Sequence, residues 1–341
     1  MLEKLRTRIG EFLARLFRRK PPAPGYFVTG RKGSWHGRLD AAAWIAPARD
    51  YLIYVPRGHG GWRRRTLVVL LHGCKQSPEE FASATGIATL ADRHGWLVLM
   101  PRQVKKANPY SCWNWFDAAT AAGRGETAIV AAQVRAARRR FHVHPRRVFV
   151  AGFSAGGCLA AALGVRHPEA FAGVFVHSGA PCGAASGPMT AMKVMKEGAN
   201  TQYEQIARQA RARAAPRALP LPLLVVHGAR DAVVAEVNGV QLARQFLVLN
   251  GRDIDAGARS ALPAADRVAT VTLPGGREVT TSDYREGVRV VRVAQLDHSW
   301  SGGDSRFPYN DPHPPAATEL LGEFVERGLR VAWEGLAGMP A

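Results

Sequence analysis

The stretch RRVFVAGFSAGGCLAAAL, Arg146–Leu163, runs from an apolar, β-branched segment into small residues and then into an alanine-rich segment. The first part has the composition of a buried strand and the last part that of a helix. Gly152, Ser154 and Gly156 at the corner have the spacing G-x-S-x-G. In a strand-to-helix turn, this spacing exposes the serine hydroxyl on a strained corner where larger flanking side chains would collide with their neighbours. Ser154 is therefore the predicted nucleophile.

Similar apolar runs occur on both sides of this stretch, at residues 66–73, 96–101, 173–179 and 222–228. Their hydrophobicity is continuous rather than alternating, which is typical of parallel strands covered on both faces. Helical patterns lie between them, at residues 79–95, 125–141 and 156–171. This alternation predicts a doubly wound α/β fold with a mostly parallel sheet. Residues 25–30 and 51–56 are expected to add an antiparallel edge.

Two segments interrupt the alternation. Residues 186–215 have helical composition and are expected to form an excursion near the site, and residues 268–296 alternate and turn at "PGG" as a C-terminal hairpin insertion. We predict a single catalytic domain over residues 25–338. Residues 1–24 would precede it as a basic amphipathic helix and a proline-rich linker.

A serine nucleophile needs a base, and the base needs an orienting carboxylate. In the chain order typical of the G-x-S-x-G motif, both follow the serine. Asp231 comes shortly after an apolar run, and His298 follows an extended segment and precedes small residues. We therefore expect Ser154, Asp231 and His298 to form a catalytic triad. The candidates that fit this pattern less well are Asp253, Asp255, Asp266, His177, His227 and His313.

Two backbone amides are expected to stabilise the oxyanion of such a site. One belongs to Ala155, the residue after the nucleophile, at the start of a helix whose dipole favours negative charge. The other comes from the loop after an early strand, here "HGC", which makes Cys74 the predicted second donor. His72 precedes the nucleophile in the chain, so we expect it to shape this loop through hydrogen bonds rather than to act as the base.

The segment YSCWNWFDAA, residues 110–119, is predicted to be a loop at the catalytic edge of the sheet. Trp113 and Trp115 would form an apolar platform for an acyl chain, with Asn114 free for hydrogen bonding. Trp300 is expected to line the same substrate site. The alternative interpretation is a local core beneath the loop.

The sequence contains four cysteines without a metal-binding spacing, so neither a metal nor an organic cofactor is predicted. Cys74 and Cys112 fall on the two loops expected at the site, and a disulfide between them would brace it. A reducing cytoplasm would keep both as thiols. The sequence leaves these two states open.

The chain carries 46 Lys and Arg against 27 Asp and Glu, a formal net charge of +19. No zinc-finger, RNA-recognition or helix-turn-helix signature accompanies this charge, so no specific nucleic-acid partner is predicted. The amphipathic helix at residues 1–20 would suit a hydrophobic granule or an anionic membrane; the alternative is a helix packed on the domain or on a partner. We recognise neither a signal peptide nor a transmembrane run, which predicts a cytoplasmic protein.

The segments "HGCKQ", "CWNWF", "GFSAGG", "HGARD" and "HSWSGG" together resemble the polyhydroxybutyrate depolymerase family of esterases, which is related to feruloyl and acetylxylan esterases. The resemblance extends roughly from Tyr51 to Val325. It implies an α/β-hydrolase fold and the same triad and oxyanion donors. Secreted family members carry a signal peptide and a polymer-binding domain that we do not recognise here, so crystalline polymer outside the cell is not the expected substrate.

The function expected from these observations is ester hydrolysis through an acyl-enzyme, with polymers or oligomers of 3-hydroxybutyrate inside the cell as the first substrate class. A short-chain or feruloyl-type carboxylesterase is the first alternative. A hydrolase of an anionic polymer such as polyaspartate is the second, because it would use the positive charge. A non-catalytic protein that binds granules or membranes is an alternative from another class. The sequence does not define the oligomeric state.

Overall fold

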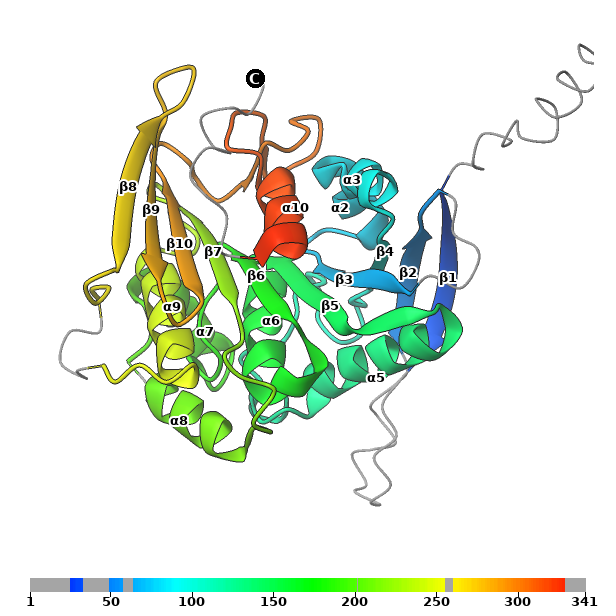
Figure 1. Ribbon diagram of the computed structural model, residues 1–341, viewed down its shortest axis with the longest axis horizontal. Coiled ribbons are helices and arrows are strands. Elements are labelled where there is room, and N and C mark those ends of the chain that lie inside the picture. Colours follow the sequence, from blue (N-terminus) through cyan, green and yellow to red (C-terminus); the bar gives the residue numbers. More distant parts are fainter. Residues whose placement is uncertain (1–24, 33–48, 58–63, 201, 255–259, 329–341) are drawn as a thin grey trace, which may run out of the picture.

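Strand β5 (Val143–Phe153) lies near the middle of a ten-stranded sheet, and helix α6 (Ala155–Arg166) follows it after a single residue. These are the strand, corner and helix predicted from the quoted stretch. The structure is a computed structural model that describes residues 25–32, 49–57, 64–200, 202–254 and 260–328 (Figure 1).

The strands beside β5 form a mostly parallel sheet. They are β1 (Tyr26–Lys32), β2 (Arg49–Val55), β3 (Arg65–Leu71), β4 (Leu97–Pro101), β6 (Gly173–His177), β7 (Leu223–Gly228), β8 (Arg267–Thr272), β9 (Glu278–Tyr284) and β10 (Val288–Val293). Their order in space is β1-β2-β4-β3-β5-β6-β7-β10-β9-β8. The strands from β4 to β10 in this order run parallel, and antiparallel pairs extend the sheet at both edges. The edge pairing expected at residues 25–30 and 51–56 is the β1–β2 pair.

Helices cover both faces of this sheet (Figure 1). One face packs against α5 (Gly125–Arg140), α6 and α9 (Val237–Leu249), and the other against α2 (Pro78–Thr85), α3 (Ile87–His94) and α10 (Ala317–Arg327). Successive β3 residues enter opposite cores, because side chains alternate across a strand: Val69 belongs to the first cluster and Val68 to the second. Both faces therefore need apolar residues, which explains the continuous runs and confirms the doubly wound α/β arrangement.

The helical pattern predicted over residues 79–95 is divided into two helices. Gly86 lies between α2 and α3 with φ of 64°, a left-handed conformation that ends a helix and favours glycine. The excursion at residues 186–215 consists of α7 (Pro188–Glu197) and α8 (Tyr203–Arg213). The remaining short helices are α4 (Ala118–Ala121) and the 3-10 turn η2 (Pro168–Ala170).

The predicted amphipathic helix and linker of residues 1–24 lie outside the described residues, as does the end of the predicted domain at residues 329–338. The domain limits therefore stay predictions. In the part of the chain that is described, no helix is long and apolar enough to cross a membrane.

The parallel strands end at one edge of the sheet, which is where ligands bind in open α/β folds. His72 follows β3, Ser154 follows β5, and Asp231 lies three residues beyond β7. His298 follows β10 in the same way, and the short pair β11 (Trp300–Ser301) and β12 (Asn310–Asp311) comes next. The topology thus brings the predicted site residues to a single edge.

Candidate active site

Ser154 occupies the corner between β5 and α6 in a strained backbone conformation. Its φ is 56° and its ψ is −123°, a region that residues with a side chain rarely adopt. A Cβ atom at Gly152 would overlap the carbonyl group of Gly156, and one at Gly156 would overlap the carbonyl oxygens of Leu71 and His72. The two glycines therefore allow the close approach of strand and helix that keeps the serine on the corner.

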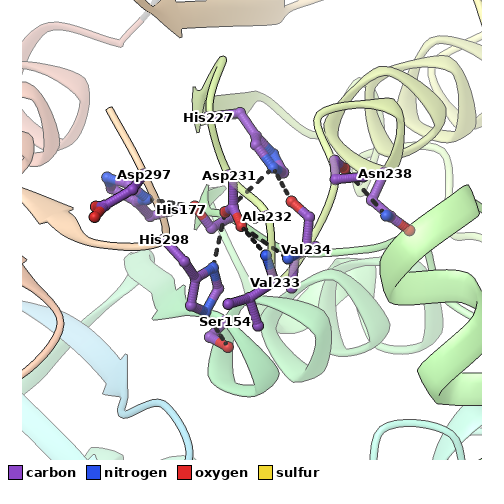
Figure 2. Close-up of polar contacts among 12 residues, drawn as sticks. Ser154, His177, His227, Asp231, Ala232, Val233, Val234, Asn238, Asp297 and His298 are labelled. Atoms are coloured by element: carbon purple, nitrogen blue, oxygen red, sulfur yellow. Dashed lines mark hydrogen bonds and ion pairs between the residues drawn. The ribbon is translucent and has the colours of Figure 1, made fainter. Parts of the chain in front are cut away.

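The side chains of Ser154, His298 and Asp231 form a continuous hydrogen-bonded row (Figure 2). His298 Nε2 lies 2.9 Å from Ser154 Oγ, and His298 Nδ1 lies 2.8 Å from Asp231 Oδ2. An ionised carboxylate only accepts hydrogen bonds, so Nδ1 carries the proton and Nε2 accepts from the serine hydroxyl. All three residues are buried, with 6–8% of their surface exposed. The arrangement is that of a nucleophile, a base and an orienting acid.

Asp231 is held as a carboxylate. Burial opposes its ionisation, but the hydrogen bonds from His298 and the Val234 amide, with the electrostatic interaction with the His298 and His227 imidazoles, outweigh burial and lower the pKa of Asp231 below its ordinary value. The amides of Val233 and Val234 donate to Oδ1 at 3.0 and 2.8 Å. Both carboxylate oxygens are therefore occupied, which fixes the orientation that the imidazole meets.

Two further histidines pack around this row in their neutral forms. His227 lies beside Asp231, with Nε2 2.8 Å from the Val234 carbonyl oxygen and 3.6 Å from Asp231 Oδ2 (Figure 2). His177 stacks on Trp300 with ring centroids 5.2 Å apart. Burial is the largest cause that lowers the pKa of both, to about 3 for His177. Neither histidine lies within hydrogen-bonding distance of Ser154 Oγ in the described contacts, so they do not replace His298 as the base.

The loop after β3 contains backbone amides that make no hydrogen bond within the described part of the protein. Gly73 N donates to Gln76 Oε1 at 2.8 Å, and Lys75 N donates to the Tyr110 carbonyl oxygen at 2.7 Å. Among the described residues, no hydrogen bond uses the amides of Cys74 or Ala155. These are the two donors expected from the sequence. Their role in binding an oxyanion stays a proposal.

The aromatic residues expected at the substrate site are in the interior. Trp113 and Trp300 are fully buried and Trp115 is 5% exposed. Trp113 Nε1 donates to the His72 carbonyl oxygen at 3.1 Å, and Trp300 Nε1 donates to Thr318 Oγ1 at 3.1 Å. The alternative interpretation, a local core beneath the loop of residues 110–119, describes Trp113 and Trp115 better, and Trp300 is enclosed in the same way. These side chains leave no aromatic face exposed to an acyl chain.

Asn114 is also engaged within the protein. Its amide and side chain bond to the carboxylate of Glu126, at 2.7 and 3.2 Å, and its Oδ1 accepts from Asn108 at 2.9 Å. Glu126 is itself buried, and burial is the main reason that its pKa is raised. This network takes up the hydrogen-bonding capacity that the sequence interpretation had assigned to substrate.

Cys74 and Cys112 form a disulfide, with Cα atoms 4.2 Å apart. This answers the question that the sequence left open. The bond joins the loop after β3 to the loop after β4, so the proposed oxyanion donor Cys74 is tied to residues 104–112. Cys158 and Cys182 are buried free thiols.

Tyr309 is a candidate substrate contact that was not singled out from the sequence. Its ring centroid lies 6.4 Å from that of His298, and 38% of the residue is exposed. Its carbonyl accepts from Trp300 N at 2.8 Å in the β11–β12 pair, which fixes it beside the base. Tyr309 follows the predicted histidine by eleven residues of loop, a separation over which a sequence pattern carries no signal about proximity.

The profile of the "Esterase PHB depolymerase" family matches residues 49–270 of this chain. Poly(3-hydroxyalkanoate) depolymerase C of Paucimonas lemoignei is 30% identical over 189 residues, which cover 55% of this chain and 45% of that protein. Poly(3-hydroxybutyrate) depolymerase of Ralstonia pickettii is 23% identical over 352 residues, covering 97% and 69%. The chain thus matches less than half the length of the first of these relatives.

An acetyl xylan esterase from Aspergillus awamori has a similar solved structure, with a TM-score of 0.60 and 20% sequence identity. The match covers 73% of this chain and 88% of that one. At this identity the likeness concerns the fold, and it confirms the predicted α/β-hydrolase fold. Proteins named as esterases therefore occur both among the relatives found by sequence and among the solved structures with a similar fold.

Proposed function

The chain belongs to the esterase PHB depolymerase family, and from this premise we propose that it is a serine hydrolase acting on ester bonds, in which Ser154, His298 and Asp231 carry the reaction. The observation that supports this assignment best is the unbroken row of hydrogen bonds from Ser154 Oγ through His298 to Asp231. Two of the relatives are named as depolymerases of poly(3-hydroxyalkanoate) and poly(3-hydroxybutyrate). We therefore also propose oligomers or polymers of 3-hydroxybutyrate as the substrate of this chain.

In the proposed mechanism, Ser154 Oγ attacks the ester carbonyl carbon as its proton passes to His298 Nε2. The carbonyl oxygen becomes an oxyanion that accepts hydrogen bonds from the amides of Cys74 and Ala155. Asp231 stabilises the imidazolium without taking its proton. The imidazolium then protonates the leaving alcohol, and the acyl-enzyme forms as the C–O bond breaks.

Deacylation repeats these steps with water. His298 takes a proton from the water as the water oxygen bonds to the acyl carbon. The imidazolium then returns this proton to Ser154 Oγ as the bond between Oγ and the acyl carbon breaks, which releases the carboxylic acid and restores the free serine. The mechanism therefore proceeds through the buried row and the two amides described above.

Hydrolysis of p-nitrophenyl butyrate by the purified protein tests the catalytic assignment. Ser154→Ala should lower kcat by more than about 10³-fold, because the nucleophile and its activated proton are lost. Ser83, which is exposed on α2, supplies a matched control: Ser83→Ala should keep full activity. Turnover that survives unchanged in Ser154→Ala would refute the assignment.

Competition among substrate classes is tested by comparing 3-hydroxybutyrate oligomers with feruloyl esters and polyaspartate. We expect the hydroxybutyrate esters to have the highest kcat/KM. A higher value for feruloyl or simple short-chain esters would favour the carboxylesterase alternative.

The cytoplasmic location and the granule anchor at residues 1–20 stay proposals. A disulfide such as Cys74–Cys112 is more typical of oxidising compartments.

A further inference from the structure

A pocket of about 600 Å³ lies beside the loop that carries the proposed oxyanion donor. The start of α2 and the loop after β4 form its walls. The residues that matter for its chemistry are Lys75, Gln76, Glu80, Arg102, Lys105 and Tyr110. None of them belongs to the Ser154–His298–Asp231 row, and the mechanism above leaves the pocket unused.

This pocket lies against the loop that carries Cys74, because Lys75 and Gln76 of that loop line it. A Cβ atom at Gly73 would lie 3.0 Å from the ring of Phe153, which precedes Ser154, and 3.1 Å from Gln76 Oε1 in the pocket wall. Lys75 directly follows Cys74. A ligand in this pocket would therefore lie next to the loop that carries the proposed oxyanion donor.

The side chains that line the pocket carry more positive than negative charge: Lys75, Arg102 and Lys105 against Glu80. Arg102 pairs with Glu79, and Glu80 accepts from Ser77 N at 2.9 Å in the capping box of α2. Within the described residues, no carboxylate pairs with the ammonium groups of Lys75 or Lys105. Two ammonium groups thus remain to attract an anion into this space.

The pocket walls are held in a fixed backbone conformation. Lys75 and Ser111 have φ of 61° and 52°, which is unusual for residues with a side chain. The hydrogen bond from Lys75 N to the Tyr110 carbonyl and the Cys74–Cys112 disulfide join the two walls. The Lys75 ammonium group lies 6.0 Å from the centre of the exposed Tyr110 ring. Strained residues that surrounding bonds hold in place are typical of ligand-binding sites.

Resting on the proposed esterase function, we propose that this pocket binds the free carboxylate of an acidic ester while the ester carbonyl lies against the Cys74 and Ala155 amides. A short hydroxyacid oligoester has this chemistry, because its leaving half ends in a carboxylate. The Lys75 and Lys105 ammonium groups would pair with that carboxylate, and Tyr110 would contact the alkyl chain. A long polyester has one such end among many ester bonds, so the pocket favours short oligomers.

The test compares the 3-hydroxybutyrate dimer with its methyl ester, in which an uncharged methyl ester replaces the free carboxylate. Cleavage of the internal ester is followed by chromatography, and the readout is the ratio of kcat/KM for the acid to that for the methyl ester. This ratio cancels general effects on the catalytic groups. We expect it to fall about 2- to 5-fold in each of Lys75→Gln and Lys105→Gln, further in the double variant, and with rising salt in the wild type. Lys193→Gln, on exposed α7, is the charge-matched control and should leave the ratio unchanged.

A ratio that stays constant in the double variant would overturn the carboxylate site, and so would an equal fall in Lys193→Gln. In either case, Ser154-dependent cleavage of the methyl ester would leave the proposed esterase function intact. Loss of the proposed function has a different signature: p-nitrophenyl butyrate would be hydrolysed equally by the wild type and by Ser154→Ala.

Discussion

His72 orients the peptide bond between Gly73 and Cys74 and does not act as a catalytic base. Gln103 N donates to His72 Nε2 at 3.2 Å, so the proton is on Nδ1, which donates to the Gly73 carbonyl oxygen at 2.8 Å. Burial is the main reason that the pKa of His72 falls to about 4, which keeps this neutral form at ordinary pH. In a trans peptide the C=O and N–H groups point in opposite directions. The bond to Gly73 therefore directs the Cys74 N–H away from His72 and holds the peptide that carries the proposed oxyanion donor.

We expect His72→Leu to lower kcat for p-nitrophenyl butyrate by about 10- to 100-fold with little change in KM, because a misdirected amide stabilises the transition state less. His72→Asn places an N–H donor near the position of Nδ1 and should recover part of the loss. Equal losses of kcat in the two variants, at equal thermal stability, would contradict this positioning role.

Individual residues differ in how far the sequence predicts them. Ser154, Asp231 and His298 were predicted because their order and their places after apolar runs identify groups that meet at one sheet edge. The role of Trp113 was not predictable, because the sequence shows that an indole lies in the segment but not whether its face is covered. Tyr309 was missed for the same reason: its exposure depends on a loop conformation that the sequence pattern does not encode.

At the scale of elements, the loops after β3 and β4 act as one unit. The disulfide joins Cys74 and Cys112 across a sequence separation of 38. Trp113 Nε1 also donates a hydrogen bond to the carbonyl oxygen of His72, at the start of the same loop. Glu126 at the start of α5 anchors the far side through Gln103 and Asn114. The loop that carries the proposed oxyanion donor Cys74 is thus held by the disulfide and by the Trp113 hydrogen bond. Glu126 in turn holds the loop after β4.

Opening the disulfide should affect both stability and rate. For a closed loop of this length, the lost constraint on the unfolded chain is worth about 3–4 kcal/mol, so Cys112→Ser should lower Tm by about 5–10 °C. We also expect kcat to fall, because the Cys74 amide loses one of its supports. Calorimetry and the p-nitrophenyl butyrate assay measure the two effects.

The double variant Cys74→Ser with Cys112→Ser is the control for this prediction. It should resemble the single variant, since one substitution already removes the bond, and dithiothreitol should slow the wild type but not the double variant. Slowing of the double variant by dithiothreitol would show that the reductant acts elsewhere, for example on other groups in the assay.

The buried parallel strands could be predicted from the sequence, whereas the division of one helical segment into two helices could not. Continuous apolar runs identify buried parallel strands regardless of their neighbours. The division of residues 79–95 depends on Gly86, because an isolated glycine is compatible with either a continuous or an interrupted helix. Its left-handed conformation is decided by how α2 and α3 pack against the sheet.

At the scale of the whole molecule, the buried neutral histidines link stability to pH. The folded protein keeps His72 and His177 neutral down to pKa values of about 4 and 3, whereas the unfolded chain binds these protons below its ordinary pKa of 6.5. The unfolded state therefore takes up more protons as the pH falls from 6.5, and the free energy of unfolding decreases. Asp231, with its lowered pKa, adds to this loss only below about pH 4.

Each of these histidines should cost about 2–3 kcal/mol of stability between pH 6.5 and 4.5. We expect Tm to fall steeply over this range, and His177→Asn to show a shallower slope because one titrating group is gone. Scanning calorimetry at several pH values measures the slope. His142→Asn, at an exposed position, serves as the control, and an equal change in slope there would argue against buried histidines as the cause.

The disulfide-linked walls of the carboxylate pocket also bear on how new specificities can arise. The contacts that hold these walls are backbone hydrogen bonds, the disulfide and the side-chain bonds of Gln103 and Asn108, and no hydrogen bond or ion pair involves the exposed side chains of Lys105 and Tyr110 in the described part of the chain. Substituting Lys105 or Tyr110 would change which leaving groups the proposed pocket binds. The direction of the Cys74 amide would stay the same. If the proposed carboxylate site is correct, one or two surface substitutions would shift the preference between acidic and neutral esters and leave Ser154, His298 and Asp231 in place.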